Sequence, residues 1–236
     1  MTTTTALITG ATKGLGRETA RKLAERGWTV LLGARDAARG AAVAAEIGGD
    51  VRVLRIDVTD DASVDTAAQW VTDQIGHLDV LINNAGIVGA RMGSVEGTTP
   101  QDFLACFGVN VLGPVRVTRA FIPLLRKGTD PRIVMVSSGL GSLAITNDPE
   151  RFESTLHSLV YPSSKSALNM IASQYARALP EIKINAVDPG YTATDLNGHS
   201  GNQTVDEGTE AIVAMASAGP DGPTGGFFDR NGPVPW

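Results

Sequence analysis

The sequence has few of the side chains that build disulfides or metal sites. Cysteine occurs once, as Cys106, so the chain cannot form an internal disulfide, which is typical of proteins from a reducing compartment. We interpret Cys106 as a core residue rather than a nucleophile. The three histidines, His77, His157 and His199, are scattered along the chain, so no metal site is predicted. These absences favour a cytoplasmic protein stabilised by its apolar core.

Positive charge and long apolar runs are also scarce. The chain carries 20 lysines and arginines against 25 aspartates and glutamates, a formal net charge of −5. This balance argues against non-specific binding to nucleic acid or to an anionic membrane. No apolar run approaches the roughly 18 residues of a membrane span. The N-terminal segment has no basic stretch followed by an apolar one, so no signal peptide is expected. We therefore expect a soluble, cytoplasmic protein.

Short apolar runs alternate with helical stretches along the chain. Strands are predicted at 5–9, 29–34, 51–56, 79–83, 132–137 and 183–187, with a seventh at 226–228. Helices are predicted at 14–26, 37–47, 61–75, 100–110 and 113–126, and another begins at 161. The strands are almost continuously apolar, as strands buried on both faces are. Repeated strand–helix–strand units with right-handed crossovers build a doubly wound parallel sheet. The expected fold class is α/β, with one domain over 1–236 and about seven strands.

A glycine-rich turn, TGATKGLG (9–16), follows the first predicted strand and opens the first helix. Gly10, Gly14 and Gly16 would let the backbone turn tightly and approach a pyrophosphate at a helix N-terminus. Their spacing, G-x-x-x-G-x-G, differs from the commonest dinucleotide fingerprint. Taken alone, the pattern also fits a glycine-rich turn that binds nothing.

Further motifs follow the later strands. NNAG (83–86), the serine pair 137–138 and DPGYTAT (188–194) each stand just after a strand, and YPSSK (161–165) opens a helix. Because the carboxyl ends of parallel strands meet at one edge of a sheet, these motifs would converge on one crevice. Tyr161 and Lys165 are four residues apart, so on a helix their side chains face the same way. The pair is either an ordinary surface pair or an acid tuned by a neighbouring charge.

In this order, the motifs resemble those of the short-chain dehydrogenase/reductase family in its single-domain form, from about Ala6 to Thr194. The resemblance implies a Rossmann-type fold. It also implies a catalytic set made of Asn110, Ser138, Tyr161 and Lys165. Ser138 matches the catalytic position better than Ser137, because it is the second serine after the strand.

The residue types of this set suit hydride transfer coupled to proton transfer. A free tyrosine has a pKa of about 10, and the positive charge of Lys165 is expected to stabilise the phenolate of Tyr161. Tyr161 would then give a proton to a carbonyl oxygen, or take one in reverse, while the cofactor supplies the hydride. Ser138 would polarise the carbonyl, and Asn110 would hold a water that links Lys165 to solvent. Asn110 could instead satisfy backbone groups near a helix bend.

The resemblance also implies the residues that bind the cofactor. They are Gly10, Thr12, Lys13, Gly14, Leu15, Gly16, Arg35, Arg39, Asp57, Val58, Asn84, Ala85, Gly86, Tyr161, Lys165, Pro189, Gly190, Thr192 and Thr194. Asp57 would meet the adenine amino group, and Thr192 and Thr194 would hold the nicotinamide end. Asp57 could also be a turn residue with no ligand role.

The end of the second strand favours NADP(H) over NAD(H). Proteins that bind NAD hold the ribose hydroxyls with an acid at this position, but here it is Ala34, followed by Arg35. A guanidinium can bind a phosphate through two hydrogen bonds, and Lys13 and Arg39 could add positive charge. Asp36 could bind ribose if the strand ended later. We interpret it as the N-cap of the alanine-rich helix that follows.

The implied function is reversible, NADPH-dependent reduction of a ketone, aldehyde or quinone to an alcohol, with Tyr161 as general acid/base. The alternative is a catalytically idle dinucleotide-binding protein that senses redox state. The expected partner is a small-molecule carbonyl or alcohol, and a homo-oligomer is possible.

The stretch between Ser138 and Tyr161 is longer than is usual in this family, as it is in carbonyl reductases. Residues 143–160 are therefore expected to border the substrate crevice, with Leu143, Phe152 and His157 as candidate wall residues. The other interpretation is a surface loop without a role in function.

Overall fold

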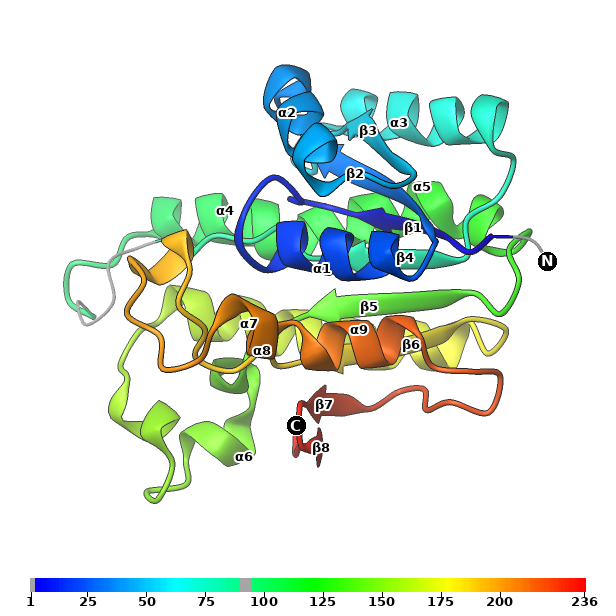
Figure 1. The fold of residues 1–236 in the computed structure, drawn as a ribbon. Coiled ribbons are helices and arrows are strands. Elements are labelled where there is room, and N and C mark those ends of the chain that lie inside the picture. Colours follow the sequence, from blue (N-terminus) through cyan, green and yellow to red (C-terminus); the bar gives the residue numbers. More distant parts are fainter. Residues whose placement is uncertain (1–2, 90–94) are drawn as a thin grey trace.

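The fold is built on one eight-stranded sheet with the strand order β3-β2-β1-β4-β5-β6-β7-β8. A computed structural model describes residues 3–89 and 95–236. The strands are β1 Thr5–Ile8, β2 Thr29–Ala34, β3 Val51–Arg55, β4 Val80–Asn83, β5 Arg132–Val136, β6 Lys183–Val187, β7 Phe227–Asp229 and β8 Gly232–Pro233. Figure 1 shows the sheet with helices on both faces. The predicted α/β class is confirmed.

The strands β1 to β7 pair in parallel, and only the β7–β8 pair among the described strands is antiparallel. Six predicted strands and the seventh at 226–228 are present, each within about two residues of its predicted bounds. The eighth strand was not predicted. Gly232–Pro233 is too short to show an apolar pattern, and proline is unusual inside a strand.

The longer helices cover the two faces of the sheet. They are α1 Gly14–Glu25, α2 Ala37–Ile47, α3 Asp61–Gln74, α4 Pro100–Phe107, α5 Gly113–Leu125, α7 Val160–Ala178 and α9 Glu210–Ala216. Shorter helical segments are α6 Leu143–Thr146, α8 Val205–Gly208 and the turns η2 Gly139–Gly141, η3 Phe152–Thr155 and η4 Asp195–Asn197. Within the described residues, no helix is long and apolar enough to cross a membrane.

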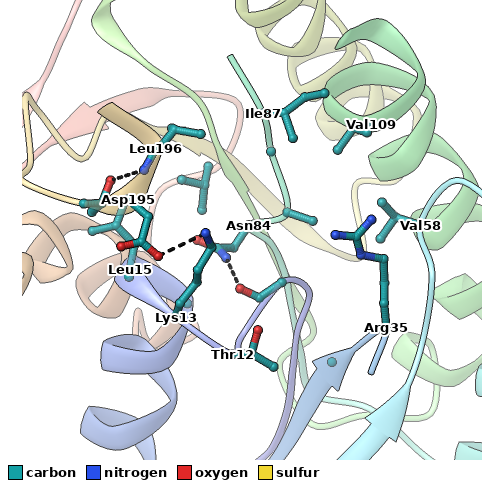
Figure 2. Close-up of a pocket in the computed structure, with 18 of the residues that line it drawn as sticks. Thr12, Lys13, Leu15, Arg35, Val58, Asn84, Ile87, Val109, Asp195 and Leu196 are labelled. Carbon is teal, nitrogen blue, oxygen red and sulfur yellow. Dashed lines mark hydrogen bonds and ion pairs between the residues drawn. The ribbon is translucent and has the colours of Figure 1, made fainter. Parts of the chain in front are cut away.

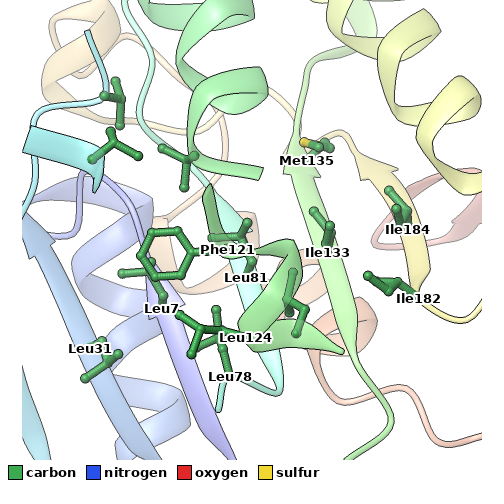
Figure 3. Close-up of a cluster of buried hydrophobic side chains, with 14 of the residues drawn as sticks. Leu7, Leu31, Leu78, Leu81, Phe121, Leu124, Ile133, Met135, Ile182 and Ile184 are labelled. Atoms are coloured by element: carbon green, nitrogen blue, oxygen red, sulfur yellow. The ribbon is translucent and has the colours of Figure 1, made fainter. Parts of the chain in front are cut away.

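Alternate residues of each strand enter two separate cores, because successive side chains of a strand point to opposite faces. Leu7 and Leu81 pack against Phe121 of α5 in one cluster (Figure 3). Ile8 packs on the other face, in a cluster that includes Leu23 of α1. The central strands therefore have both faces buried, which explains their almost continuous apolar sequence.

A π-helical turn, η1 (Gly108–Leu112), joins α4 to α5. The sequence predicted two helices here, and the structure joins them through this widened turn. π-turns are rare, and they are often found at functional sites. Asn110 lies in the middle of the turn and is fully buried.

We predict that Phe121→Ala lowers the free energy of unfolding by about 3–5 kcal/mol, because truncating a buried phenylalanine leaves a cavity. Phe121 is 0 % exposed in the core between α5 and the sheet. Leu104→Ala is the control, because Leu104 is 67 % exposed and should change stability by less than about 0.5 kcal/mol. Urea unfolding of both variants measures the difference. Equal losses would contradict the described core.

Candidate active site

A cavity of about 450 Å³ opens at the carboxyl ends of the central strands. Figure 2 shows residues that line it. Those predicted from the sequence are Gly10, Thr12, Lys13, Gly14, Leu15, Gly16, Arg35, Asp57, Val58, Asn84, Ala85, Gly86, Tyr161, Lys165, Pro189 and Thr194. The motifs expected to converge on one crevice therefore do so.

Some predicted residues stand away from this cavity wall. Arg39, Gly190 and Thr192 are not among its lining residues, and neither are the catalytic candidates Asn110 and Ser138. Arg39 is exposed on α2. The Thr192 hydroxyl donates to the carbonyl of Pro189 at 2.9 Å, so its side chain stabilises the loop itself.

The glycine-rich turn leaves no room for side chains. A Cβ atom on Gly16 would lie 2.5 Å from Nδ2 of Asn84 and 2.6 Å from the carbonyl oxygen of Gly10. Gly10 and Gly14 also adopt positive φ values of 64° and 52°, which glycine tolerates best. No described side chain caps the N-terminus of α1, which begins at Gly14. Its backbone N–H groups are thus available to an anion.

Thr9 joins the glycine-rich turn to the end of β4, and the sequence did not identify it as a site residue. Its hydroxyl oxygen accepts hydrogen bonds from the backbone N–H groups of Asn84 and Ala85, both at 3.0 Å. The Asn84 amide donates to the carbonyls of Thr9 and Gly10 at 2.9 and 3.2 Å. The side chain of Asn84 therefore holds the turn in place.

At the end of β2, Asp36 is the N-cap of α2, as predicted. Its carboxylate accepts from the backbone N–H groups of Ala38 and Arg39 at 2.9 and 3.1 Å. Ala34 and Arg35 line the cavity beside it. Asp36 therefore has a structural role as the cap of α2.

Asp57, after β3, also has local partners. Its carboxylate accepts from the backbone N–H and the hydroxyl of Thr59 at 2.9 and 2.7 Å. Burial acts to raise the pKa of Asp57, but these hydrogen bonds and the charges of Arg35 and Arg116 outweigh it and lower the pKa. Asp57 is therefore a turn residue, as the sequence allowed, and it also lines the cavity.

Lys13 reaches across the cavity to the loop after β6. Its ammonium lies 3.0 Å from the carboxylate of Asp195 (Figure 2), which also lies 3.0 Å from Nε2 of His199. The sequence gave no indication of Asp195 as a partner. The ion pair joins the glycine-rich turn to η4, and both residues line the cavity.

Tyr161 and Lys165 lie in the first turns of α7, deep in the site. The Lys165 ammonium is 5.5 Å from the centre of the Tyr161 ring and donates to the carbonyl of Val136 at 2.8 Å. Burial lowers the pKa of Lys165 to about 8, against the opposing charges of Cys106 and Asp188. Most of the Lys165 side chains therefore remain protonated at neutral pH.

The pKa of Tyr161 moves in the direction opposite to the one predicted. Burial raises it, the charge of Asp188 raises it further, and a hydrogen bond with Ser138 opposes both. The sequence spacing shows that a lysine is near but does not show how deeply the phenol is buried. Desolvation of the phenolate is the larger effect here.

The two serines after β5 have different partners. Ser137 is buried, and its hydroxyl donates to Oδ1 of Asn169 at 2.5 Å. Ser138 accepts from the backbone N–H of Leu140 at 3.2 Å, and its hydroxyl is close enough to Tyr161 to act against the rise of the pKa of Tyr161. Ser138, the serine selected from the sequence, is thus the one directed to Tyr161.

Asn110 lies in the π-turn but satisfies backbone groups of Ile87, in the segment after β4, rather than those of the helix bend itself. Its oxygen accepts from the N–H of Ile87 at 2.9 Å, and its amide donates to the Ile87 carbonyl at 2.8 Å and to the Ser164 hydroxyl at 3.0 Å. A Cβ on Gly86 would lie 3.4 Å from the Asn110 oxygen and 3.7 Å from the Lys165 ammonium. Both groups therefore approach the same glycine.

The segment 143–160 contacts the site only at its edge. Leu143, Phe152 and His157 are exposed and are not among the residues that line the cavity. The Phe152 ring lies 5.6 Å from the ring of Tyr191, centre to centre. Tyr191 follows Gly190 in the loop after β6, so the segment touches this loop.

The comparisons agree with the geometry. Residues 4–204 match the family model described as short chain dehydrogenase. The chain belongs to this family. It is 39 % identical over 224 residues to the short-chain dehydrogenase anuI of Penicillium roqueforti, covering 90 % of this chain and 88 % of that protein. It is 32 % identical to (+)-neomenthol dehydrogenase of Arabidopsis thaliana, covering 95 % of each.

Solved structures of the family share the fold. The NADPH-bound carbonyl reductase from chicken fatty liver aligns with a TM-score of 0.87 and 26 % identity, covering all of both chains. Short-chain dehydrogenases of this type are NAD(P)-dependent oxidoreductases, and so is this chain. The described residues fit such a cofactor, because an uncapped helix N-terminus, a glycine-rich turn and the cation of Arg35 border one cavity. No group of three potential metal ligands occurs among the described residues.

We predict that Gly16→Ala weakens NADPH binding and destabilises the protein by about 1–3 kcal/mol, because the added methyl group overpacks the turn. The control is Gly108→Ala, where a Cβ would meet no atom within 4 Å and the backbone is helical. Fluorescence titration with NADPH and thermal unfolding measure the two effects. Equal affinity in the parent and Gly16→Ala would show that the turn does not hold the cofactor.

Proposed function

We propose that this short-chain dehydrogenase reduces a carbonyl group to an alcohol with NADPH, with Tyr161 as the general acid. The observation that carries the proposal is the approach of Lys165 to the Tyr161 ring in the wall of the cavity, with Ser138 close to Tyr161. The names of two relatives, (+)-neomenthol dehydrogenase and carbonyl reductase, support a carbonyl–alcohol conversion.

The roles of the side chains follow from their protonation states. The nicotinamide, when bound, supplies or accepts the hydride and carries a positive charge in its oxidised form. Tyr161 is protonated at neutral pH, because burial and Asp188 raise its pKa. It can therefore donate its proton to a carbonyl oxygen that receives a hydride on carbon. Ser138, which lies close to Tyr161, would donate to the same oxygen.

Lys165 would stabilise the phenolate that this proton transfer leaves behind. It is mostly protonated near neutral pH, with a pKa lowered to about 8 by burial, and its ammonium lies 5.5 Å from the Tyr161 ring centre. An opposite charge at this range favours the ionised phenol. Asn110 fixes Ile87 and the strand-four end beside this ammonium, and we assign it a positioning role.

NADP(H) is the proposed cofactor because the end of β2 offers a cation and no free acid. Arg35 lines the cavity, and Asp36 is engaged by the N-terminus of α2. A guanidinium binds a phosphate group through two charge-assisted hydrogen bonds. Lys13 is a weaker candidate for the phosphate, because Asp195 already pairs with it.

The second candidate, a catalytically idle redox sensor, would need the cofactor cavity but no proton donor. The proximity of Ser138 to Tyr161 and the burial of Lys165 beside the Tyr161 ring favour the enzyme. A buried ammonium is costly to keep in a site that has no use for it. A perturbed pKa in a cleft is the usual sign of chemistry.

The segment 143–160 is proposed to shape the substrate entrance rather than the cofactor cavity. Phe152 packs on Tyr191, and Oε1 of Glu153 lies 3.1 Å from the Cβ position of Gly139, directly after Ser138. The segment therefore touches both loops that flank the reacting groups. Phe152, rather than Leu143 or His157, is the member with an observed contact to the site loops.

We predict that Tyr161→Phe abolishes most carbonyl reduction and leaves NADPH affinity nearly unchanged. The phenol oxygen is the proton donor in the proposed reaction, and loss of general acid catalysis typically costs 10²–10⁴-fold. Tyr175→Phe, the same change further along α7, should retain full activity. Turnover is measured with a panel of ketones, aldehydes and quinones. Near-parental turnover of Tyr161→Phe would exclude the proposed mechanism.

We predict that Arg35→Ala lowers the preference for NADPH over NADH by about ten- to a hundredfold, because a hydrogen bond to a charged group contributes about 1.5–3 kcal/mol. Arg39→Ala is the matched control, since Arg39 does not line the cavity. The measurement is kcat/KM for both cofactors in the parent and both variants. A parent that uses NADH equally well would mean that Asp36, not Arg35, contacts the ribose.

A further inference from the structure

Ser164 carries a fully buried hydroxyl in α7, between Tyr161 and Lys165 in the sequence. This hydroxyl donates to the backbone carbonyl of Tyr161 at 2.7 Å. It also accepts a hydrogen bond from the side-chain amide of Asn110 at 3.0 Å, although the two residues are 54 positions apart. One side chain outside the implied catalytic set thus connects the backbone of Tyr161 to the π-turn η1.

The first turn of α7 has no capping side chain among the described residues. The neighbouring Ser163 is exposed, and its hydroxyl donates to the carbonyl of Leu159, the residue just before the helix. This hydrogen bond stays within one segment of the chain. The hydrogen bond between Ser164 and Asn110 instead holds the turn against a different element of the fold.

Asn110 extends the connection to the segment after β4. Its side chain holds both the N–H and the carbonyl of Ile87, at 2.9 and 2.8 Å. Ile87 lines the cofactor cavity, and so do Tyr161 and Lys165. The hydrogen bonds from Ile87 through Asn110 and Ser164 to Tyr161 therefore join two walls of the cavity.

The surroundings of Ser164 offer no equal replacement for its hydroxyl. The Asn110 amide also donates to the sulfur of Cys106 at 3.2 Å, and the Cys106 thiol lies 3.6 Å from the Ser164 oxygen. Sulfur is a weak hydrogen-bonding atom. All three side chains are 0 % exposed, so bulk water does not reach them. Loss of the hydroxyl would leave a buried amide N–H with only a weak acceptor.

We propose that Ser164 is a positioning residue that acts through Asn110. It holds the first turn of α7, with the Tyr161 phenol and the Lys165 ammonium, against the segment after β4 that lines the cofactor cavity. This inference rests on the proposed function, because the groups that it positions are the reacting groups of that function. A displacement of about 1 Å between reacting groups can cost about a hundredfold in rate.

The first test is Ser164→Ala, for which we expect kcat to fall about tenfold or more. NADPH affinity, measured by fluorescence titration, should stay within about twofold of the parent, because Asn110 keeps both hydrogen bonds to Ile87. A residue that only stabilised the fold would lower the unfolding temperature and leave kcat unchanged where the variant is folded. Parental kcat in Ser164→Ala would therefore overturn the inference.

Ser163→Ala is the matched control, because it makes the same change one residue earlier in α7. Its hydroxyl bonds only to the backbone of Leu159 among the described residues, so kcat should remain parental. Equal losses of kcat in Ser163→Ala and Ser164→Ala would overturn the inference, because the contact with Asn110 would then not be the cause.

A double-mutant cycle with Asn110→Ala tests whether Ser164 acts through Asn110. Residues that act through a shared hydrogen bond have non-additive effects, so Ser164→Ala should cost less than about twofold in kcat once Asn110 is replaced. A tenfold loss in both backgrounds would overturn the inference. If Asn110→Ala does not fold, Asn110→Asp takes its place, because it keeps an oxygen for the Ile87 N–H and has no donor for Ser164.

Tyr161→Phe, measured in parallel, separates this inference from the proposed function. If Tyr161→Phe is inactive and Ser164→Ala has parental kcat, the role of Ser164 is wrong and the proposed function stands. If Tyr161→Phe is active, the proposed function fails, and this inference fails with it. Thermal unfolding of every variant confirms that kcat is compared between folded proteins.

Discussion

The pairing of β1 with both β2 and β4 is the constraint on which the site depends. The chain leaves β1 in one direction through β2 and β3 and returns to build β4 on the other side. The crossover helices on the two sides lie on opposite faces, so the carboxyl ends of β1 and β4 are left open to a ligand. The hydroxyl of Thr9 joins the ends of β1 and β4 by accepting hydrogen bonds from two backbone N–H groups that follow β4.

Burial governs the electrostatics at the far end of the same crevice. Desolvation raises the pKa of Tyr161 and lowers that of Lys165 to about 8, so it favours the neutral form of each group. The acidic phenol is thereby held in its proton-donating form, which suits the proposed reduction. The phenolate formed during turnover would depend on Lys165 and on the charge of the oxidised cofactor for its stability.

The sequence predicted those features that have a local signal. The bounds of α2 were right because Asp36 and Gly48 mark its two ends, and the central strands were right because their apolar runs are nearly continuous. The two-residue strand β8 and the π-turn around Asn110 have no comparable pattern. The direction of the Tyr161 pKa was wrong for a related reason. Sequence spacing reveals a neighbouring charge, whereas burial is a property of the whole fold.

Sequence spacing does not reveal long-range ion pairs either. The ion pair of Lys13 shows how this affects the prediction of the cofactor. From the sequence, Lys13 and Arg35 are two similar cations near the proposed phosphate position. In the folded chain, Lys13 pairs with Asp195 from a loop more than 180 residues later in the sequence, while Arg35 acts on Asp57 through its charge from the cavity wall. A phosphate that recruited Lys13 would have to compete with Asp195, and exposed ion pairs are weak enough to exchange. Lys13 is therefore better suited to link cofactor binding to the loop that carries Asp195 than to select the phosphate, which supports the proposal that Arg35 makes the selection.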